Sequence, residues 1–535
     1  MFGLKSIMKY AAVAAAALTM VACGEEKEKF SQASEGNMIP DNAIMAMKID
    51  AEQLFDKALG AKGSEVRSAW NRVKAAVPMY ASSMGEIGTL AADVVKDPST
   101  LGLRIDEPVV LSFAAELKDY EAEEGDVEVC LVALLDDSKA FVKVADAVMD
   151  LVNEEAELGM TKEVVSDTYT YYACTPEEGM SIDMGIAEKS VVVRFKASTT
   201  EDSKSLKTSM LGLFNNGGPA KTDGLEAFYA SKGDVAIWMD CEGTINMALP
   251  AMEQIEPMAV AQLKEYIPMY KKSSMVTDLV FKEGQTLIQF KMFGSKEMMA
   301  YTEKYCASAT NKYLHEIPFY PMLAVNVAMK DFAGMMEEMG KMSKEYKEVL
   351  TYMESFGINE KVLAGFPGNI TFALDGTGIN SREVPGMILL MDCGENVWQL
   401  AEQYLPMVAE EVSEDVYCIE DMFCVSYENG TLKAADIATF ITEPYEFDYA
   451  ESYLGDEISE GGIAIDFSCL PMEVLDEVAK EVDRKMTGED LLEYFDSVVI
   501  KMSPDHMTTS IALNMGDQDE NLLAKIILYA VHSAF

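Results

Sequence analysis

The sequence predicts an α+β fold, a tandem duplication of strand-helix-strand-strand-helix units with mostly antiparallel sheets and helices packed on one face. Three observations lead to this prediction. Similar blocks recur in the same order in both halves of the chain, short apolar runs alternate with amphipathic segments, and turn residues separate neighbouring runs. A chain of 535 residues is long enough for several units of domain size.

The duplication is visible in pairs of blocks that keep their order along the chain. The pairs are residues 39–50 with 317–327, residues 129–136 with 387–392, and residues 233–237 with 461–465. Because repeats constrain the architecture more strongly than local propensities do, we divide the body into a first half, residues 38–310, and a second half, residues 311–535.

The repeated unit occurs twice in each half, and a three-strand meander separates its two copies. A ferredoxin-like split βαβ arrangement is one topology that fits such a unit. In the second meander, Asn429 and Gly430 predict a type I′ hairpin, because both positions of that turn need positive φ. The four copies lie near residues 41–155, 232–309, 321–411 and 461–533.

Carboxylate or hydroxyl side chains precede the predicted helices. We interpret them as N-caps, which accept hydrogen bonds from the free amides of the first helical turn, and not as metal ligands. The row comprises Asp50, Asp136, Asp137, Ser138, Asp240, Ser295, Asp392 and Asp517.

Residues 1–22 resemble a bacterial lipoprotein signal peptide. Two lysines precede an apolar run, residues 10–20, that is too short to span a membrane as a helix, which takes about 20 residues. The run leads into a sequence that resembles a lipobox, with Met20 where leucine is usual. The resemblance implies cleavage before Cys23 and attachment of lipid to its thiol, whereas the alternative is an ordinary signal peptide.

Residues 23–37 are acidic and Ser-rich, which predicts a flexible tether. An acidic run behind a lipidated cysteine resembles the surface-export signal of some outer-membrane lipoproteins, and a plain solvated linker is the alternative. We therefore expect an exported protein that lipid anchors in the cell envelope, at the outer membrane and, if the run is a signal, on the cell surface.

The charge balance limits the classes of partner. A net charge of −47 argues against nucleic acid, because phosphate binding needs lysine and arginine. It also argues against a polybasic attachment to anionic lipid, which leaves the lipid anchor as the predicted contact with the membrane.

Two features are candidates for covalent or ligand chemistry. Cys418 and Cys424 flank a predicted tight turn and are the best candidates for a disulfide, with free buried thiols as the alternative. An aromatic and acidic loop could stack on sugars or hold a cationic ligand, or its rings could pack against the core. The loop residues are Tyr445, Phe447, Asp448, Tyr449 and Tyr453.

Three stretches carry a further resemblance, namely residues 39–50, residues 97–103 with Glu107 and Pro108, and residues 365–374. Together they resemble an uncharacterised lipoprotein family, the domain of unknown function forty-eight thirty-six. The resemblance would extend over nearly the whole mature chain and implies a lipid-anchored envelope protein. It implies no activity and no functional residues.

No motif in the sequence indicates a particular reaction. It contains no Gly-rich phosphate loop, HExxH or GxSxG motif, so we predict no catalytic residues, metal or cofactor. The leading interpretation is a non-enzymatic binding module for an envelope protein or a glycan. The alternatives are a carboxylate-based glycan hydrolase and a lipoprotein that binds cations or small molecules.

Overall fold

In the computed structural model the chain forms two compact units, and each is described by itself. The first comprises residues 1–260, 271–281 and 523–535, and the second comprises residues 261–270 and 282–522. The structure describes residues 39–60, 64, 66–68, 70–72, 74–75, 92–94, 97–119, 124–156, 159–167, 169–176, 179–198, 223–255, 257, 260, 264, 267–342, 344–355, 357–366, 368–376, 385–419, 422–444, 461–482, 484–503 and 507–527.

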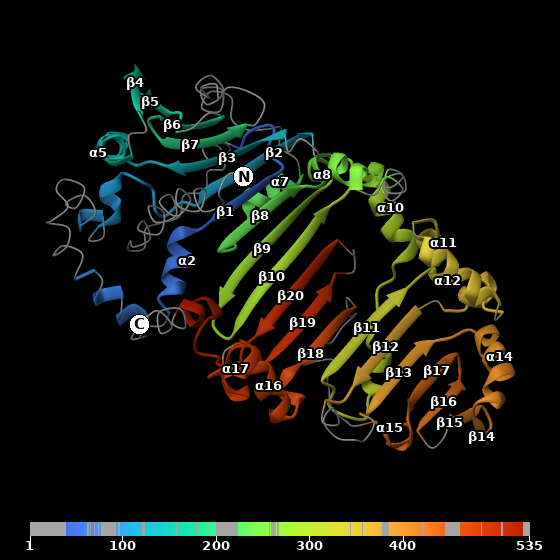
Figure 1. Cartoon of the computed structure of the whole chain (residues 1–535). Helices are drawn as coiled ribbons and strands as arrows, with labels where there is room; N and C mark the ends of the chain where they lie inside the picture. Colours follow the sequence, from blue (N-terminus) through green and yellow to red (C-terminus); the bar gives the residue numbers. More distant parts are fainter. Residues whose placement is uncertain are drawn as a thin grey trace. The chain divides into compact units, whose positions relative to one another are not determined.

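The first unit contains an antiparallel sheet with the order β4-β5-β6-β7-β3-β2-β1-β8-β9 (Figure 1). Apolar and β-branched residues alternate with other side chains along most of these strands, as expected for a sheet with two different faces. The strands are β1 (Met45–Ile49), β2 (Val109–Asp119), β3 (Glu124–Leu134), β4 (Thr161–Ser166), β5 (Tyr169–Cys174), β6 (Met180–Ile186), β7 (Ser190–Ser198), β8 (Val235–Asp240) and β9 (Ser274–Lys282).

The second unit contains an antiparallel sheet with the order β10-β20-β19-β18-β11-β12-β13-β17-β16-β15-β14. Its strands are β10 (Gln285–Phe293), β11 (Leu323–Met329), β12 (Gly368–Leu374), β13 (Met387–Asp392), β14 (Glu410–Ser413), β15 (Val416–Ile419), β16 (Phe423–Glu428), β17 (Thr431–Asp436), β18 (Gly462–Asp466), β19 (Ser497–Met502) and β20 (Thr508–Asn514).

The two sheets share one strand order. If β1 is matched with β11, β2 with β12 and so on up to β9 with β19, matched strands have matched neighbours. Matching Ala46 in β1 with Ala324 in β11 aligns a whole row of directly opposite residues, which we name the central row of each unit. In the first unit it comprises Val276, Trp238, Ala46, Ser112, Cys130, Arg194, Asp183, Ala173 and Thr161. In the second unit it comprises Val499, Ala464, Ala324, Ala373, Ile388, Ala435, Cys424, Cys418 and Glu410.

The helices follow the predicted strand-helix-strand-strand-helix order, and the mixed α+β class with antiparallel sheets is confirmed. In the first unit they are α2 (Ala51–Ala58), η1 (Pro98–Leu101), α5 (Ser138–Ala156), α7 (Asp223–Ala230) and α8 (Cys241–Ile255). In the second they are η2 (Ile267–Tyr270), α10 (Lys296–Tyr305), η3 (Asn311–Glu316), α11 (Phe332–Met342), α12 (Lys344–Ser355), α13 (Glu360–Leu363), α14 (Glu395–Tyr404), η4 (Leu405–Met407), α15 (Ile437–Ile441), η6 (Phe467–Cys469), α16 (Met472–Val482) and α17 (Gly488–Tyr494).

Several predicted local signals are confirmed. Asp50, Asp137 and Ser295 accept hydrogen bonds from backbone amides at the starts of α2, α5 and α10. Asn429 and Gly430 have φ values of 50° and 81°, as the type I′ turn between β16 and β17 requires.

Two finer predictions of the fold are wrong. The split βαβ arrangement fails because β1 pairs with β2 and β2 pairs with β3, so that the strands form a meander. Helices also lie on both faces of the first sheet. Helix α5 packs on the face that carries Tyr172, whereas Lys48 from the other face donates to the carbonyl of Tyr229 at the end of α7. Both faces of the sheet carry buried residues, so one helical layer could not shield it from water.

No helix within the described residues is long and apolar enough to cross a membrane.

Candidate functional site

The structure tests few of the residues that the sequence singled out. Cys23 and the loop residues Tyr445, Phe447, Asp448, Tyr449 and Tyr453 lie outside the described residues. Cys418 and Cys424 are directly opposite each other on β15 and β16 and are joined as a disulfide, with their Cα atoms 4.1 Å apart. Cys424 is buried, so the pair belongs to the sheet and not to an exposed turn.

The first corner of interest lies where β2 and β3 of the first unit meet η1. The side chain of Asp97 accepts from the amide of Ser99, and the turn ends at Gly102 with a φ of 73°. The Gly102 carbonyl then accepts from the amides of Asp136 and Asp137 at 2.9 and 3.1 Å. A side chain at Gly102 would collide with the Asp137 carbonyl, so glycine is needed for this close approach.

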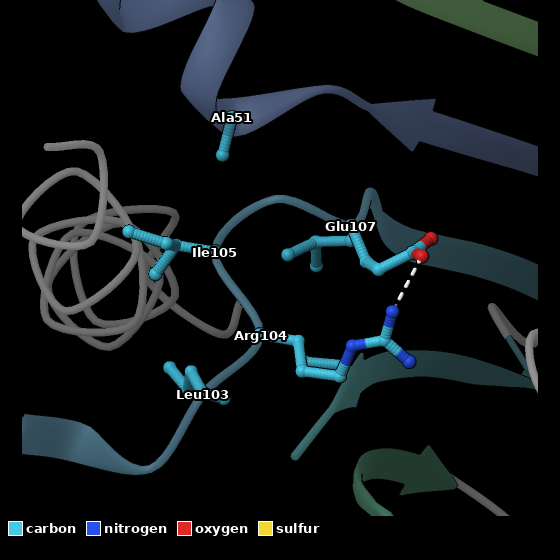
Figure 2. Close-up of a pocket in the computed structure, with 7 residues that line it drawn as sticks. Ala51, Leu103, Arg104, Ile105 and Glu107 are labelled. Atoms are coloured by element: carbon cyan, nitrogen blue, oxygen red, sulfur yellow. Dashed lines mark hydrogen bonds and ion pairs between the residues drawn. The ribbon is translucent and has the colours of Figure 1, made fainter. Parts of the chain in front are cut away.

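Arg104 extends from this turn into a small hollow (Figure 2). Its guanidinium contacts Glu107 at 2.7 Å, with Asp136 at 3.8 Å and Asp106 at 4.0 Å. The free volume is about 10 Å³, which is room for about one water molecule. This hollow is too small to hold a sugar residue between two carboxylates, as a glycan hydrolase would require.

The matching corner of the second unit is organised around Asp392, which the sequence predicted to be a helix cap. That prediction is wrong, since α14 has Gly394 at its N-cap position. One oxygen of Asp392 instead accepts from Lys312 Nζ at 2.6 Å and from the Tyr313 hydroxyl at 2.7 Å. The other accepts from the backbone amide of Asn369 at 2.6 Å. By accepting these hydrogen bonds, the carboxylate holds η3, β12 and β13 together.

This network shifts the proton affinities of its members. Burial would raise the pKa of Asp392, but the hydrogen bonds from Lys312, Asn369 and Tyr313 together lower it below its ordinary value. Burial alone would lower the pKa of Lys312, but the hydrogen bonds to Asp392 and Tyr313, together with the charges of these two groups, raise it above its ordinary value. The pair is therefore a stable ion pair at neutral pH, which suits a structural role.

The outer edges of the two sheets differ in charge. On β4, Lys162 Nζ lies 2.7 Å from Asp146 of α5 and 5.7 Å from the ring centre of Tyr172, the residue opposite it on β5. On β14 the matching position is Glu411, which lies opposite Tyr417 on β15. A cation in the first unit is thus replaced by a carboxylate in the second.

A second carboxylate, Glu402 from α14, acts on the same tyrosine as Glu411. Burial raises the pKa of the Tyr417 phenol, and the negative charges of Glu411 and Glu402 raise it further. Within the part of the chain that the structure describes, neither carboxylate forms an ion pair or a side-chain hydrogen bond.

Apolar side chains are exposed beside this edge, between α14 and β14. We name them the edge patch, and its members are Tyr404, Met407, Val408 and Val412, with exposed fractions of 44%, 76%, 63% and 58%. Tyr404 is the last residue of α14, Met407 lies in η4, and Val412 lies on β14. The patch therefore directly precedes β14 in the chain and includes one of its residues. Sequence analysis missed the edge patch, because exposure depends on which strand ends the sheet.

The profile of a protein family described as domain of unknown function DUF4836 matches residues 35–440. The chain belongs to the DUF4836 family. The two stretches on which the resemblance partly rested form the Gly102 corner and the strand β12 beside Asp392. In the first, the Gly102 carbonyl accepts from amides that precede α5, and in the second, the Gly365 carbonyl accepts from the amide of Gly394 at the N-cap of α14.

Other comparisons add little to the family assignment. A search of curated proteins found no match. The chain is similar to a solved structure described as crystal form III of TP0453, with 12% identity over 52% of this chain and 89% of that chain and a TM-score of 0.25, a level that supports no argument. Among the described residues, no group of three or more histidine, cysteine, aspartate or glutamate side chains is placed to hold a metal ion.

Proposed function

We propose that this DUF4836 protein is a non-enzymatic interaction module that binds a partner in the cell envelope. The observation that carries the proposal is the edge patch, where four large apolar side chains are exposed beside the terminal strand β14. Exposed apolar side chains that gather in one place are typical of protein interaction sites. Among the described strands β14 pairs with β15 alone, and its other edge offers backbone donors and acceptors that a partner can use.

The same proposal places the protein at the outer membrane, exported and held by lipid on Cys23. The support is the sequence pattern of residues 1–22 and the acidic tether that follows. Mass spectrometry of the mature protein should find the chain beginning at Cys23 with acyl chains attached. An unmodified amino terminus at Cys23, or a retained leader, would contradict the anchor.

Site-specific photo-crosslinking tests the interaction role. A photoreactive amino acid in place of Met407, in the full chain expressed in cells, should give a discrete crosslinked product. The matched control is Val164 on the corresponding edge strand β4, whose exposed fraction is 67%. A product from Met407 that disappears on Val408→Asp supports the proposal, whereas no product, or the same product from both positions, contradicts it.

The proposal also includes a tandem duplication as the origin of the body. Its support is the common strand order and the alignment of the two central rows from Ala46 and Ala324 outward. The last strands of the two halves, β10 and β20, pair with Ile288 directly opposite Ile511. The boundary at residues 310 and 311 is kept as the boundary between the two copies.

A further inference from the structure

The edge strands β4 and β14 differ in charge at one matched position, which is Lys162 on β4 and Glu411 on β14. In the first unit, Lys162 fills the space between Asp146 and the ring of Tyr172, and the Tyr172 hydroxyl also donates to Asp146 at 2.8 Å. The acid, the cation and the aromatic ring are all supplied by the chain. A lysine on an edge strand is a common feature that discourages the addition of a further strand, and here the lysine is held in an ion pair within the unit.

Within the described part of the second unit the ring and the acid are present, and no lysine or arginine takes the place of Lys162. Tyr417 takes the place of Tyr172, Glu402 supplies a carboxylate from the helix, and Glu411 replaces the lysine. The negative charges of Glu411 and Glu402 both act on the Tyr417 phenol, and a cation between the two carboxylates would offset this charge. The first unit therefore shows which group would complete the second, namely an ammonium or guanidinium above the tyrosine ring.

The cation has to come from outside the described part of the second unit. A strand added beside β14 would place one side chain directly opposite Glu411, on the face that carries Tyr417. The edge patch lies on the same border and offers apolar contact to the remaining side chains. A second copy of this chain is a poor candidate, because its net charge of −47 makes the two copies repel each other.

We propose that β14 binds an extended segment of a partner protein in which lysine or arginine alternates with apolar residues. The segment adds to the free edge as a further strand, its cation lies between Glu402 and Glu411, and its apolar side chains cover Met407 and Val408. The inference rests on the proposed function and names the chemistry of the partner at the same site.

Fluorescence anisotropy of a short labelled peptide that alternates lysine with valine, titrated with the full mature chain, tests the inference. We expect binding that weakens with added salt, and weaker binding of a peptide that alternates lysine with serine. A peptide that alternates glutamate with valine should not bind. Failure of the lysine and valine peptide to bind would overturn the inference.

The decisive variant is Glu411→Lys, which recreates the ion pair of the first unit and fills the site from within. It should weaken peptide binding by about tenfold, since an attractive contact becomes a repulsive one. The matched control is Glu410→Lys, which makes the same change of charge on the opposite face of the strand. Equal weakening by both variants would show binding to general negative charge and would overturn the inference.

Three further outcomes separate this inference from the proposed function. If calcium alone raises the melting temperature, Glu411→Lys abolishes that effect and the peptide does not bind, the site takes a metal ion and the inference is wrong. If the peptide does not bind but the crosslink from Met407 still forms, the interaction role stands and only the strand-addition chemistry fails. If both are absent, both proposals fail.

Discussion

The central rows of the two units have the same topology but opposite chemistry. In the first unit the row contains Arg194 directly opposite Asp183, and the arginine also pairs with Glu128 two residues along β3 from the row. In the second unit the matching positions are Ala435 and Cys424. All five residues are buried. One unit therefore buries charges at positions where the other buries small apolar groups.

This difference shows that the ion pair is not needed to form the fold. The second unit builds the same strand order with an alanine in place of the arginine, and removing charges from water is costly unless they are well paired. We interpret the pair as a determinant of specificity. Strands of two similar units on one chain can mispair, and Arg194 in the second sheet would be buried without Glu128.

Breaking the ion pair should produce the largest loss of stability. Arg194→Met removes the ion-pair partner of the buried Glu128, and Glu128→Leu removes an ion-pair partner of the buried Arg194, so each should lower the free energy of unfolding by about 3–5 kcal/mol. The double variant should lose much less than the sum of the two. Urea unfolding of the three variants measures this, and additive losses would show that the two side chains act independently.

The double variant also tests the specificity interpretation. It removes the buried Arg194–Glu128 pair and leaves an apolar side chain at position 194, where the second unit has Ala435, so it should refold with a lower yield of monomer even where its stability is close to that of the natural chain. The comparison is the yield of monomer after dilution from denaturant. An unchanged yield would contradict the view that the charges prevent mispairing.

The Asp392 network should show the next largest effect and a pH dependence of known sign. Asp392→Ala removes the acceptor of Lys312, Tyr313 and the Asn369 amide and should cost about 2–3 kcal/mol. Because the folded-state pKa of Asp392 is lowered, its contribution is fully present above the ordinary value of 3.8. It is lost as the pH falls through the lower folded-state pKa.

The measurement is urea unfolding at several pH values for the natural chain and for Asp392→Asn. The unfolding free energy of the asparagine variant should decrease less at acid pH than that of the natural chain. Asp519→Asn, at an exposed carboxylate, is the matched control. Identical acid profiles for the natural chain and Asp392→Asn would rule out the ionised network.

The sequence predicted the strands and the class of fold because alternating side chains and turn residues are local signals. The hairpin at Asn429 and Gly430 depends on four consecutive residues, so it was predictable in detail. The order of strands was not, because β3 pairs with β7 across α5 and three other strands. Pairing over such separations depends on packing that no local pattern encodes.

The site residues follow the same rule. An aspartate before a helix is the usual signal of a cap, and Asp392 carries that signal while its side chain bonds to Lys312, 80 residues earlier in the chain. The contrast between Lys162 and Glu411 could have been found by aligning the two meanders strand by strand. Its meaning depends on Asp146, which only the folded structure brings to the tyrosine.

Removing the disulfide should have a moderate effect confined to the second unit. Cys418 and Cys424 are six residues apart, and closing so short a loop restricts the unfolded chain by about 2 kcal/mol. Cys424→Ala with Cys418→Ala should lower the unfolding free energy by that amount. Thiol labelling under denaturing conditions, without reductant, tests the bond itself, and two free thiols at these positions would show that it does not form.

The smallest expected effects come from the two matched turns that precede β2 and β12. The side chain of Asp97 caps η1 and that of Asn359 caps α13, and each accepts a hydrogen bond from the amide two residues later. Asp97→Ala and Asn359→Ala should each cost about 1 kcal/mol, measured by urea unfolding. Asp97→Asn and Asn359→Asp keep an acceptor and should restore most of the loss. Equal losses in the two units would show that the turns contribute alike, so that the units differ in their central rows and edges and not in this corner. A loss in one unit alone would mean that only that turn supports its helix.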